Sequence, residues 1–428
     1  MGPAMKKTFI PLMFSIILLG FATATSVSAS TIHVPREEAT IQAGIDAAAN
    51  GDTVLVDPGT YFENINFNGK AITVSSAGGA AVTIVDGGNI APVVTFSSGE
   101  TTDSMLSRFT LQHGASSYES RYMAGGIYIS YSSPTVSDNI ITDNTALGGG
   151  GGIAVEFGSP RIIGNKIQNN TQGAGSGGIG GGGISVGGIG TTQILNNVIS
   201  NNSWTSGNGG GISLFASGAV TIRGNVIKGN SVSGVIPAAV GGGIYIASES
   251  PARIVQNLIY GNTADLGGGI YFSMLGGQSG LTLVNNTIAN NPVRQLAGSA
   301  VYADGFDNQV PFYNNLMIGQ HGQSAVFCEG ANSNLPPSVA NSDGFSPGGM
   351  GFAGTCAGFE SQNGNISADP KFVNRRKNFK LMPDSPAIDA GTNSAPLLPR
   401  KDFSRQERVV DGDDDGNAII DMGPYEFQ

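Results

Sequence analysis

The chain has 428 residues, of which 12% are charged and 40% are hydrophobic, with 66 glycines and a formal net charge of −10. A negative surface repels nucleic acid and anionic membranes, so this composition argues against binding to either. It also argues against an acidic polysaccharide held by direct ion pairs, unless a bound cation bridges the two. The hydrophobic fraction excludes a disordered chain, and the glycine content is typical of tight, repeated turns.

Residues 1–29 have the pattern of an export signal. Lys6 and Lys7 precede an apolar run from Phe9 to Ala22, and a small-residue cleavage site ends at Ala29. Removal of two of the 21 basic residues leaves 19 against 31 acidic ones, which moves the net charge from −10 to −12. No later stretch is apolar over the length of a membrane span, although a retained anchor remains the alternative interpretation of the signal. We expect a secreted or cell-surface protein, outside the cytoplasm.

Residues 30–111 are predicted to form an N-terminal cap and the first turns of a stacked fold. Thr40 can cap a short helix that extends through Ala49, with Ile41, Ile45 and Ala48 on one face. Such a helix would cover an apolar end that otherwise stays open. Strands are predicted at residues 53–56, 71–74, 82–85 and 93–96, separated by glycine and asparagine turns.

Residues 112–327 repeat one pattern seven times. Each copy contains Asn-x-Ile-x-x-Asn or a close relative, and the copies start 26 to 32 residues apart, by subtraction of their positions. The first asparagines are Asn139, Asn165, Asn197, Asn225, Asn257, Asn286 and Asn315. A period of this length indicates a repeat architecture in which no single copy can bury its own apolar face.

Within each copy, apolar residues alternate with variable ones, as in strands that have one face in a core. This alternation excludes helical repeats and predicts a β-solenoid. Identical side chains would then recur about every 4.8 Å along the axis. We expect an asparagine ladder at a sharp bend, where asparagine tolerates left-handed backbone and its amide bonds to neighbouring coils.

Two stretches resemble known families. The run ATIQAGIDAAANGDTVLVDPGTYFENINFNGKAITVSS, together with the repeats that follow it, resembles the right-handed parallel β-helix superfamily, also known as pectate-lyase-like. The tail, with SPAIDAG, DGDDDG and DMGPYEF, is similar to a module that closes many exported bacterial β-helix proteins. The resemblance implies an all-β, right-handed parallel β-helix with a helical N-terminal cap and an irregular C-terminal cap. Members of the superfamily include lyases, hydrolases, epimerases and adhesins, so the fold does not decide the chemistry.

No catalytic constellation of these enzymes is evident in the repeats. The lyases of this fold resemble one another in holding Ca²⁺ with carboxylates from neighbouring coils, and the outward columns here carry only isolated acids. A polar excursion contains the catalytic candidates His113, Glu119 and Arg121, with Tyr122 as a binding candidate and Asp143 one coil later. It is either a functional cluster or a solvated loop with satisfied ion pairs.

An aromatic column offers a candidate binding surface. One outward position reads Tyr128, Ala154, Ser185, Ser213, Tyr245, Tyr271 and Tyr302 along the repeats. Tyrosine rings suit a sugar ring or a protein partner, but tyrosine also favours strands and stacks on itself. Loops of uneven length lie beside this column, and one of them carries Trp204, the only tryptophan.

Residues 328–428 are predicted to be a loop-rich C-terminal cap. Cys328 and Cys356 are the only cysteines, and in an exported protein we expect them to form a disulfide rather than free thiols. Asp411, Asp413 and Asp415 alternate before Gly416, with Asp421 farther on, which indicates a structural Ca²⁺ loop. The alternative is a solvated acidic turn.

These observations favour an exported protein that binds a polysaccharide or a surface partner along its solenoid face, without catalysis. The alternative is a carbohydrate-active enzyme, either a lyase or a glycoside hydrolase. We expect a monomer with neither nucleic acid nor a membrane span, although assembly into a surface layer would also suit a solenoid.

Overall fold

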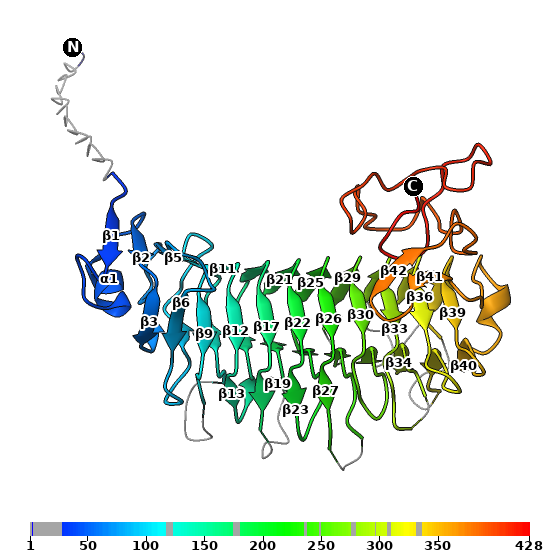
Figure 1. The fold of residues 1–428 in the computed structure, drawn as a ribbon, viewed down its shortest axis with the longest axis horizontal. Helices are drawn as coiled ribbons and strands as arrows, with labels where there is room; N and C mark the ends of the chain where they lie inside the picture. Colours follow the sequence, from blue (N-terminus) through cyan, green and yellow to red (C-terminus); the bar gives the residue numbers. More distant parts are fainter. Residues whose placement is uncertain are drawn as a thin grey trace.

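The computed structural model describes residue 2 and residues 28–116, 123–173, 180–234, 238–247, 250–274, 280–295, 297–305, 310–330 and 336–428. The described chain winds into an elongated parallel β-solenoid in which three long sheets run the length of the molecule (Figure 1). In each complete coil the chain passes through sheet A, then sheet B, then sheet C, and each strand pairs in parallel with the equivalent strand one coil on.

The three sheets have nearly equal numbers of strands. Sheet A consists of β1 (Thr31–Val34), β2 (Thr53–Val56), β5 (Thr73–Ser76), β8 (Met105–Ser107), β11 (Thr135–Ser137), β16 (Arg161–Ile163), β21 (Thr191–Leu195), β25 (Ala219–Arg223), β29 (Ala252–Val255), β32 (Thr282–Val284), β35 (Pro311–Tyr313) and β38 (Ser338–Ala340). Sheet B consists of β3 (Gly59–Phe62), β6 (Thr83–Asp86), β9 (Thr110–Gln112), β12 (Ile140–Thr142), β17 (Lys166–Gln168), β22 (Val198–Ser200), β26 (Val226–Lys228), β30 (Leu258–Tyr260), β33 (Thr287–Ala289), β36 (Leu316–Ile318) and β39 (Asp343–Phe345). Sheet C consists of β4 (Ile65–Asn66), β7 (Val94–Phe96), β10 (Ile127–Ser130), β15 (Ile153–Glu156), β20 (Ile184–Gly187), β24 (Ile212–Phe215), β28 (Ile244–Ile246), β31 (Ile270–Ser273), β34 (Val301–Asp304), β37 (Val326–Cys328) and β40 (Phe352–Gly354).

Three further sheets have fewer strands. Sheet D lies between sheets B and C in the chain and consists of β13 (Thr145–Ala146), β18 (Thr171–Gln172), β23 (Ser203–Trp204) and β27 (Ser231–Val232). The glycine strands β14 (Gly149–Gly150) and β19 (Gly180–Gly181) pair with each other, and β41 (Phe372–Asn374) and β42 (Asn378–Leu381) form an antiparallel pair in the tail.

Strand boundaries follow the predicted alternation closely. Strands β2, β6 and β7 lie within one residue of their predicted positions, whereas β5 begins two residues later than predicted. The reason for the shift is that Lys70 belongs to the preceding turn, where its Nζ donates to the carbonyls of Ile45, Asp46 and Ala48 at 2.6–2.8 Å. Inward residues of all three sheets, such as Ile141, form one continuous buried core.

Two buried asparagine ladders run along the solenoid, which confirms the ladder that the repeats predict. The first asparagines, from Asn139 to Asn286, each donate from the backbone N–H to the Oδ1 of the asparagine one coil on, at 2.8–3.0 Å, and the Asn315 N–H donates to the Ser342 hydroxyl at 3.1 Å. The second asparagines, from Asn144 to Asn262, do the same at 2.9–3.1 Å, with Asn291 as the last acceptor.

The expected left-handed backbone lies one residue earlier than predicted. Asn196 and Asn285, which precede ladder asparagines, have φ values of 55° and 54°, whereas Asn197 and Asn286 are not in the left-handed region. The preceding residue makes the bend, and this leaves the ladder asparagine free to point its amide inward.

Glycines after sheet D allow the backbone of neighbouring coils to approach closely. A Cβ at Gly211 would lie 2.6 Å from the carbonyl oxygen of Gly243 on the next coil. This contact explains why a glycine run recurs before each sheet C strand.

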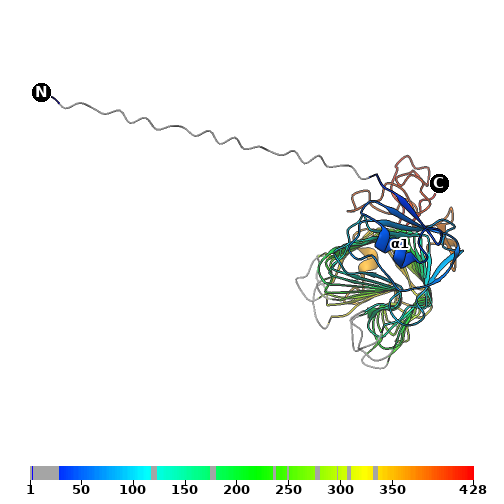
Figure 2. The ribbon, with the colours of Figure 1, turned by 90° about the vertical axis from the view of Figure 1, so that its left-hand side faces the viewer.

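The helix α1 (Ile41–Ala47) covers the N-terminal end of the core, as predicted. Thr40 is its N-cap, and the Thr40 hydroxyl accepts from the Ala43 N–H at 3.1 Å. Ile41 and Ile45 are fully buried. The end view in Figure 2 shows α1 in front of the opening between the sheets.

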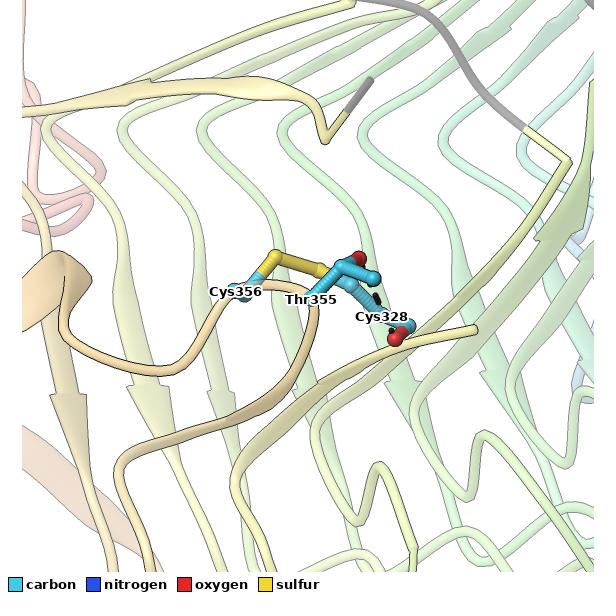
Figure 3. The surroundings of a disulfide bond; sticks show 3 residues. All are labelled: Cys328, Thr355 and Cys356. Carbon is cyan, nitrogen blue, oxygen red and sulfur yellow. Dashed lines mark hydrogen bonds between the residues drawn. A yellow bond between two sulfur atoms is a disulfide. The ribbon is translucent and has the colours of Figure 1, made fainter. Parts of the chain in front are cut away.

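The C-terminal end of the core is closed by residues that follow β40. Cys356 is buried in the core and forms a disulfide with Cys328 of β37, with Cα atoms 5.5 Å apart, in agreement with the prediction (Figure 3). The Thr355 N–H donates to the Cys328 carbonyl at 3.0 Å. Phe359, in the 3-10 helix η1 (Phe359–Ser361), packs against the end of the core.

Residues 366–428 do not cap that end, and this corrects the expected position of the tail. Figure 1 shows the tail folding back over the side of the last coils. Its apolar residues, among them Phe379 and Met422, form a second core with Leu258, Leu316 and Ile318 on the outer face of sheet B. The physical reason is that one outward column of sheet B is polar from Thr142 to Lys228 and then carries Tyr260, Ala289, Ile318 and Phe345 in the last coils.

Within the described chain, no helix has the length and apolar character to cross a membrane. The predicted export signal lies almost entirely outside the described residues.

Candidate functional site

Of the predicted catalytic candidates, the structure places only His113. Glu119, Arg121 and Tyr122 lie outside the described residues. His113 follows β9 in a left-handed turn with φ 53°, and its Nδ1 lies 2.8 Å from Oδ2 of Asp86. Sequence reasoning missed Asp86, although the register that pairs Asp86 with Gln112 places it beside His113.

The Asp86 carboxylate is held by several donors. Burial raises the pKa of Asp86, but hydrogen bonds from Gln112 and the Gly88 N–H, together with His113, outweigh burial and leave the pKa below its usual value. The pair could orient an imidazole as a base. Asp143, one coil on, is not joined to it and accepts from its neighbour Thr142 at 2.8 Å.

The predicted tyrosine column forms a stack of rings on sheet C. The rings of Tyr245, Tyr271 and Tyr302 are stacked with centroids 5.9 and 5.2 Å apart, and Phe327 extends the stack at 5.1 Å. The Tyr271 hydroxyl donates to Asp304, and that of Tyr302 donates to Glu329, both at 2.9 Å. Burial and these carboxylates raise the pKa of both tyrosines well above its usual value.

The rings of the stack are exposed to different extents. Tyr302 is only 7% exposed, whereas Tyr245 and Tyr271 are partly buried. The ring faces contact each other, which favours the structural interpretation of the column over a binding face.

Trp204 is not on a recognition surface, contrary to the sequence-based expectation. It is 2% exposed and packs in a cluster with Val232, Ala239 and Ala264 beneath sheet D. The reason is that Trp204 belongs to β23, whose inward position continues the column of Val232 on the next coil.

The same sheet C face is hollowed where the tyrosine column is interrupted. Between Tyr128 and Tyr245 the column carries the small residues Ala154, Ser185 and Ser213. The next outward column carries Gly187 between Glu156 and Phe215. A cavity of about 370 Å³ lies here, and we call it the sheet C hollow.

The base of the hollow consists of small residues and its sides are largely apolar. Ala154, Ser185 and Gly187 are outward residues of the sheet that line it. Four larger apolar residues also line it and are partly or largely exposed. These are Met123, Phe157, Ile189 and Phe215.

Phe157 is held in place from both neighbouring coils. Its ring stacks on Tyr131 of the preceding coil, with centroids 5.0 Å apart and an interplanar angle of 8°. On the following coil, a Cβ at Gly188 would lie 2.6 Å from the Phe157 ring, and Gly188 has φ 73°. Glycine at 188 therefore makes room for the ring, which remains 45% exposed.

Glu156 is the one ionisable group that lines the hollow within the described chain. Its Oε2 accepts from the Tyr128 hydroxyl at 2.6 Å, which orients the carboxylate across the sheet. His113 and Asp86 are not among the lining residues. The hollow thus offers aromatic and aliphatic surface with a single oriented acceptor.

The acidic tail loop contains a close group of carboxylates, but its members differ from those predicted. Asp389, Asp411 and Asp413 place oxygens within 4.8 Å of one another, a spacing that suits a hard cation. Asp389 was missed because it lies 22 residues before Asp411 and outside the Asp-x-Asp pattern. The calcium site stays a prediction, with Asp389 as an added ligand.

Asp415 and Asp421 have other contacts. The Asp415 N–H donates to Asp411 at 3.1 Å and to Asp413 at 3.2 Å. Asp421 is fully buried and accepts from the N–H groups of Asp389 and Phe427. Burial raises the pKa of Asp421 to about 6.

Comparison with known proteins agrees with this architecture. Among solved structures, pectate lyase Pel9A superposes with a TM-score of 0.50 at 14% identity, over 94% of this chain and 98% of its own. A mannuronic-acid-specific polysaccharide family 6 lyase from human gut microbiota gives a TM-score of 0.37 at 14% identity, over 76% and 83% of the two chains. An alginate lyase from Paenibacillus sp. strain FPU-7 gives a TM-score of 0.30 at 15% identity, over 79% of this chain and 98% of its own.

At sequence identities this low, the similarity to these solved structures concerns the fold alone. No curated protein matches the sequence. The family described as right-handed β-helix region matches at residues 55–239 and again at 176–334, well over half of the chain. The predicted right-handed parallel β-helix is therefore confirmed, and the chain belongs to the right-handed β-helix family.

Proposed function

We propose that this protein binds a polysaccharide outside the cell and holds one of its sugar rings in the sheet C hollow. The observation that carries the proposal is the interruption of the side-chain columns between Tyr128 and Tyr245, which leaves a cavity of about 370 Å³ beside an exposed, fixed aromatic ring. This volume lies within the range of small-molecule sites. The export signal predicted for residues 1–29 supports an extracellular setting.

The fold supports the ligand class. Pel9A is named as a pectate lyase, so a β-helix of this kind can work on a polysaccharide. A solenoid offers a long, straight surface, and a polymer can contact several coils at once. The ring faces of Tyr245, Tyr271 and Tyr302 are stacked on one another, so binding centres on the hollow rather than on this stack.

A panel of polysaccharides tests this function. The purified secreted protein is incubated with plant, algal and bacterial polymers, and both retention on the polymer and release of reducing or unsaturated ends are measured. We expect retention that is lost in the Phe157→Ala/Phe215→Ala variant and kept in Phe62→Ala. Phe62 is a matched control because its ring is 76% exposed on sheet B, away from the hollow. Equal retention by all three proteins would refute the proposed site.

Catalysis in the same hollow is the second candidate function. The Tyr128 hydroxyl and Glu156 form a short hydrogen bond of 2.6 Å and could move a proton. Glycoside hydrolysis, however, needs a second carboxyl group about 5–9.5 Å away. No second acid lines the hollow among the residues that the structure describes. Release of product that disappears in Glu156→Gln would establish the enzyme and replace the binding proposal.

A further inference from the structure

Among the described residues that line the sheet C hollow, one carries a charge. Glu156 lines it, and neither Lys, Arg nor His is among the lining residues of the described chain. While Oε2 of Glu156 accepts from Tyr128, its Oε1 makes no hydrogen bond within the described part of the protein. Among its described lining residues, the hollow therefore presents one free carboxylate oxygen and no group that could neutralise an anion.

The rest of the lining matches the apolar side of a sugar. The C–H groups of a pyranose form an apolar face, which packs on an aromatic ring, while its hydroxyls point outward around the rim. Phe157 supplies such a ring, and Tyr131 and Gly188 on the adjoining coils fix its position. An oriented carboxylate beside it accepts hydrogen bonds from hydroxyls, and a charged acceptor makes these stronger than neutral ones.

We infer that the hollow selects a neutral sugar ring and rejects a uronic acid, with Glu156 as the specificity-determining residue. This inference rests on the proposed polysaccharide binding. A uronate would bring its own carboxylate close to that of Glu156, and two like charges without a counter-ion repel each other where water is partly excluded. Pectate, the substrate named for Pel9A, is a uronic acid polymer, so the preferred ligand of this chain differs in class from that of its structural neighbour.

Glu329 provides a matched control for Glu156. It lies in the same outward column of sheet C, several coils away from the hollow, and it also accepts from a tyrosine, Tyr302, at 2.9 Å. Glu156→Gln and Glu329→Gln each make the formal net charge one unit less negative. Any difference between the two variants therefore reports on the hollow and not on long-range repulsion by the whole protein.

The experiment is a calorimetric titration of the secreted protein and both variants. The probes are hexasaccharides of glucose, xylose and mannose, and hexamers of galacturonate and mannuronate. Each is measured with EDTA, so that no cation bridges two carboxylates, and again with Ca²⁺. We expect the wild type to bind a neutral hexamer and to bind neither uronate at comparable affinity.

Glu156→Gln should weaken neutral binding roughly tenfold, the loss expected for one charge-assisted hydrogen bond, and should narrow the gap between neutral and uronate ligands. Glu329→Gln should change neither the affinity for neutral hexamers nor the gap between neutral and uronate ligands. A uronate hexamer that binds the wild type as tightly as the best neutral hexamer, in either buffer, overturns this inference but leaves polysaccharide binding intact. If the ratio of neutral to uronate affinity in Glu156→Gln equals that of the wild type, the inference is also overturned. Absence of binding by every hexamer overturns both the inference and the proposed function.

Discussion

Asn225 donates to Oδ1 of Asn257, one coil on, through both its backbone N–H at 2.9 Å and its Nδ2 at 3.0 Å. Its Nδ2 also reaches back to the Ile194 carbonyl at 2.8 Å, and its own Oδ1 accepts from the Asn197 N–H at 2.8 Å. One side chain thus satisfies two buried backbone groups of the preceding coil and also bonds to the ladder amide of the next coil. The repeat keeps asparagine here because few other side chains combine a donor and an acceptor in this geometry.

Asn225→Ala should destabilise the solenoid by about 2–4 kcal/mol, because at least two buried groups lose their partners at about 1–3 kcal/mol each. Urea unfolding followed by circular dichroism measures the change. Gln193→Ala, on the outer face of β21, is the control and should have little effect. Equal midpoints for the two variants would contradict the structural role of the ladder.

The Cys328–Cys356 disulfide joins β37 to the segment that follows β40 and covers the end of the core. Cys328→Ala/Cys356→Ala should lower the free energy of unfolding by about 2–4 kcal/mol, the usual contribution of a disulfide that closes a loop of this size. The native protein should show no reactive thiol when titrated without reductant. Two titratable thiols in the oxidised, folded protein would exclude the bond.

Asp343 makes stability depend on pH. It is fully buried in β39 under the tail, where Oδ1 accepts from the Ala368 N–H at 3.1 Å and Oδ2 has no hydrogen-bond partner. Burial raises the pKa of Asp343 well above its ordinary value of 3.8. Below pH 3.8 the folded and unfolded chains are both protonated here. As pH rises, the unfolded chain releases this proton first, so the free energy of unfolding falls.

Asp343→Asn should therefore raise the melting temperature, and its advantage over the wild type should grow from pH 4 to pH 8. Thermal unfolding at several pH values measures this difference. Asp103→Asn, at an exposed turn, is the control and should show no such trend. A constant difference between Asp343→Asn and the wild type across this range would show that Asp343 does not titrate as we describe.

Ca²⁺ should bind the tail through Asp389, Asp411 and Asp413. Calorimetry with CaCl₂ should give one site that is lost in Asp389→Asn and in Asp411→Asn, because each removes a carboxylate ligand. Asp414→Asn, which changes an exposed carboxylate outside the group, should leave binding in place. Bound Ca²⁺ should also raise the melting temperature with concentration. Absence of heat with the wild-type protein would leave the solvated acidic turn as the correct interpretation.

The fold could be predicted in detail because the repeated sequence pattern marks the strands of each coil. The same side chains recur at Ile141, Ile167 and Ile199, and parallel in-register pairing places them in one column. The helical cap followed from Thr40 and the apolar spacing of Ile41 and Ile45. Such features depend on residues close in sequence or on an exact period.

The position of the tail could not be predicted, because it depends on which outward positions of distant coils are apolar. Asp389 joins the acidic group only through the fold of the tail. Trp204 was misplaced because sheet D consists of two-residue strands, too short to show an alternating pattern. The sequence indicates only part of the hollow, namely the small residues that interrupt the tyrosine column. Its shape also depends on Phe157, Gly188 and Phe215, which belong to two further columns.

The central claim is that an exposed aromatic ring at the sheet C hollow binds a sugar, and polysaccharide retention by Phe157→Ala tests it most directly. Removing this ring leaves the core intact, because Phe157 lies outside the buried core and its ring is 45% exposed. We predict at least a tenfold loss of affinity for the best polymer, with a melting temperature close to that of the wild type and with Phe62→Ala unchanged. Wild-type affinity in a correctly folded Phe157→Ala protein would contradict the account.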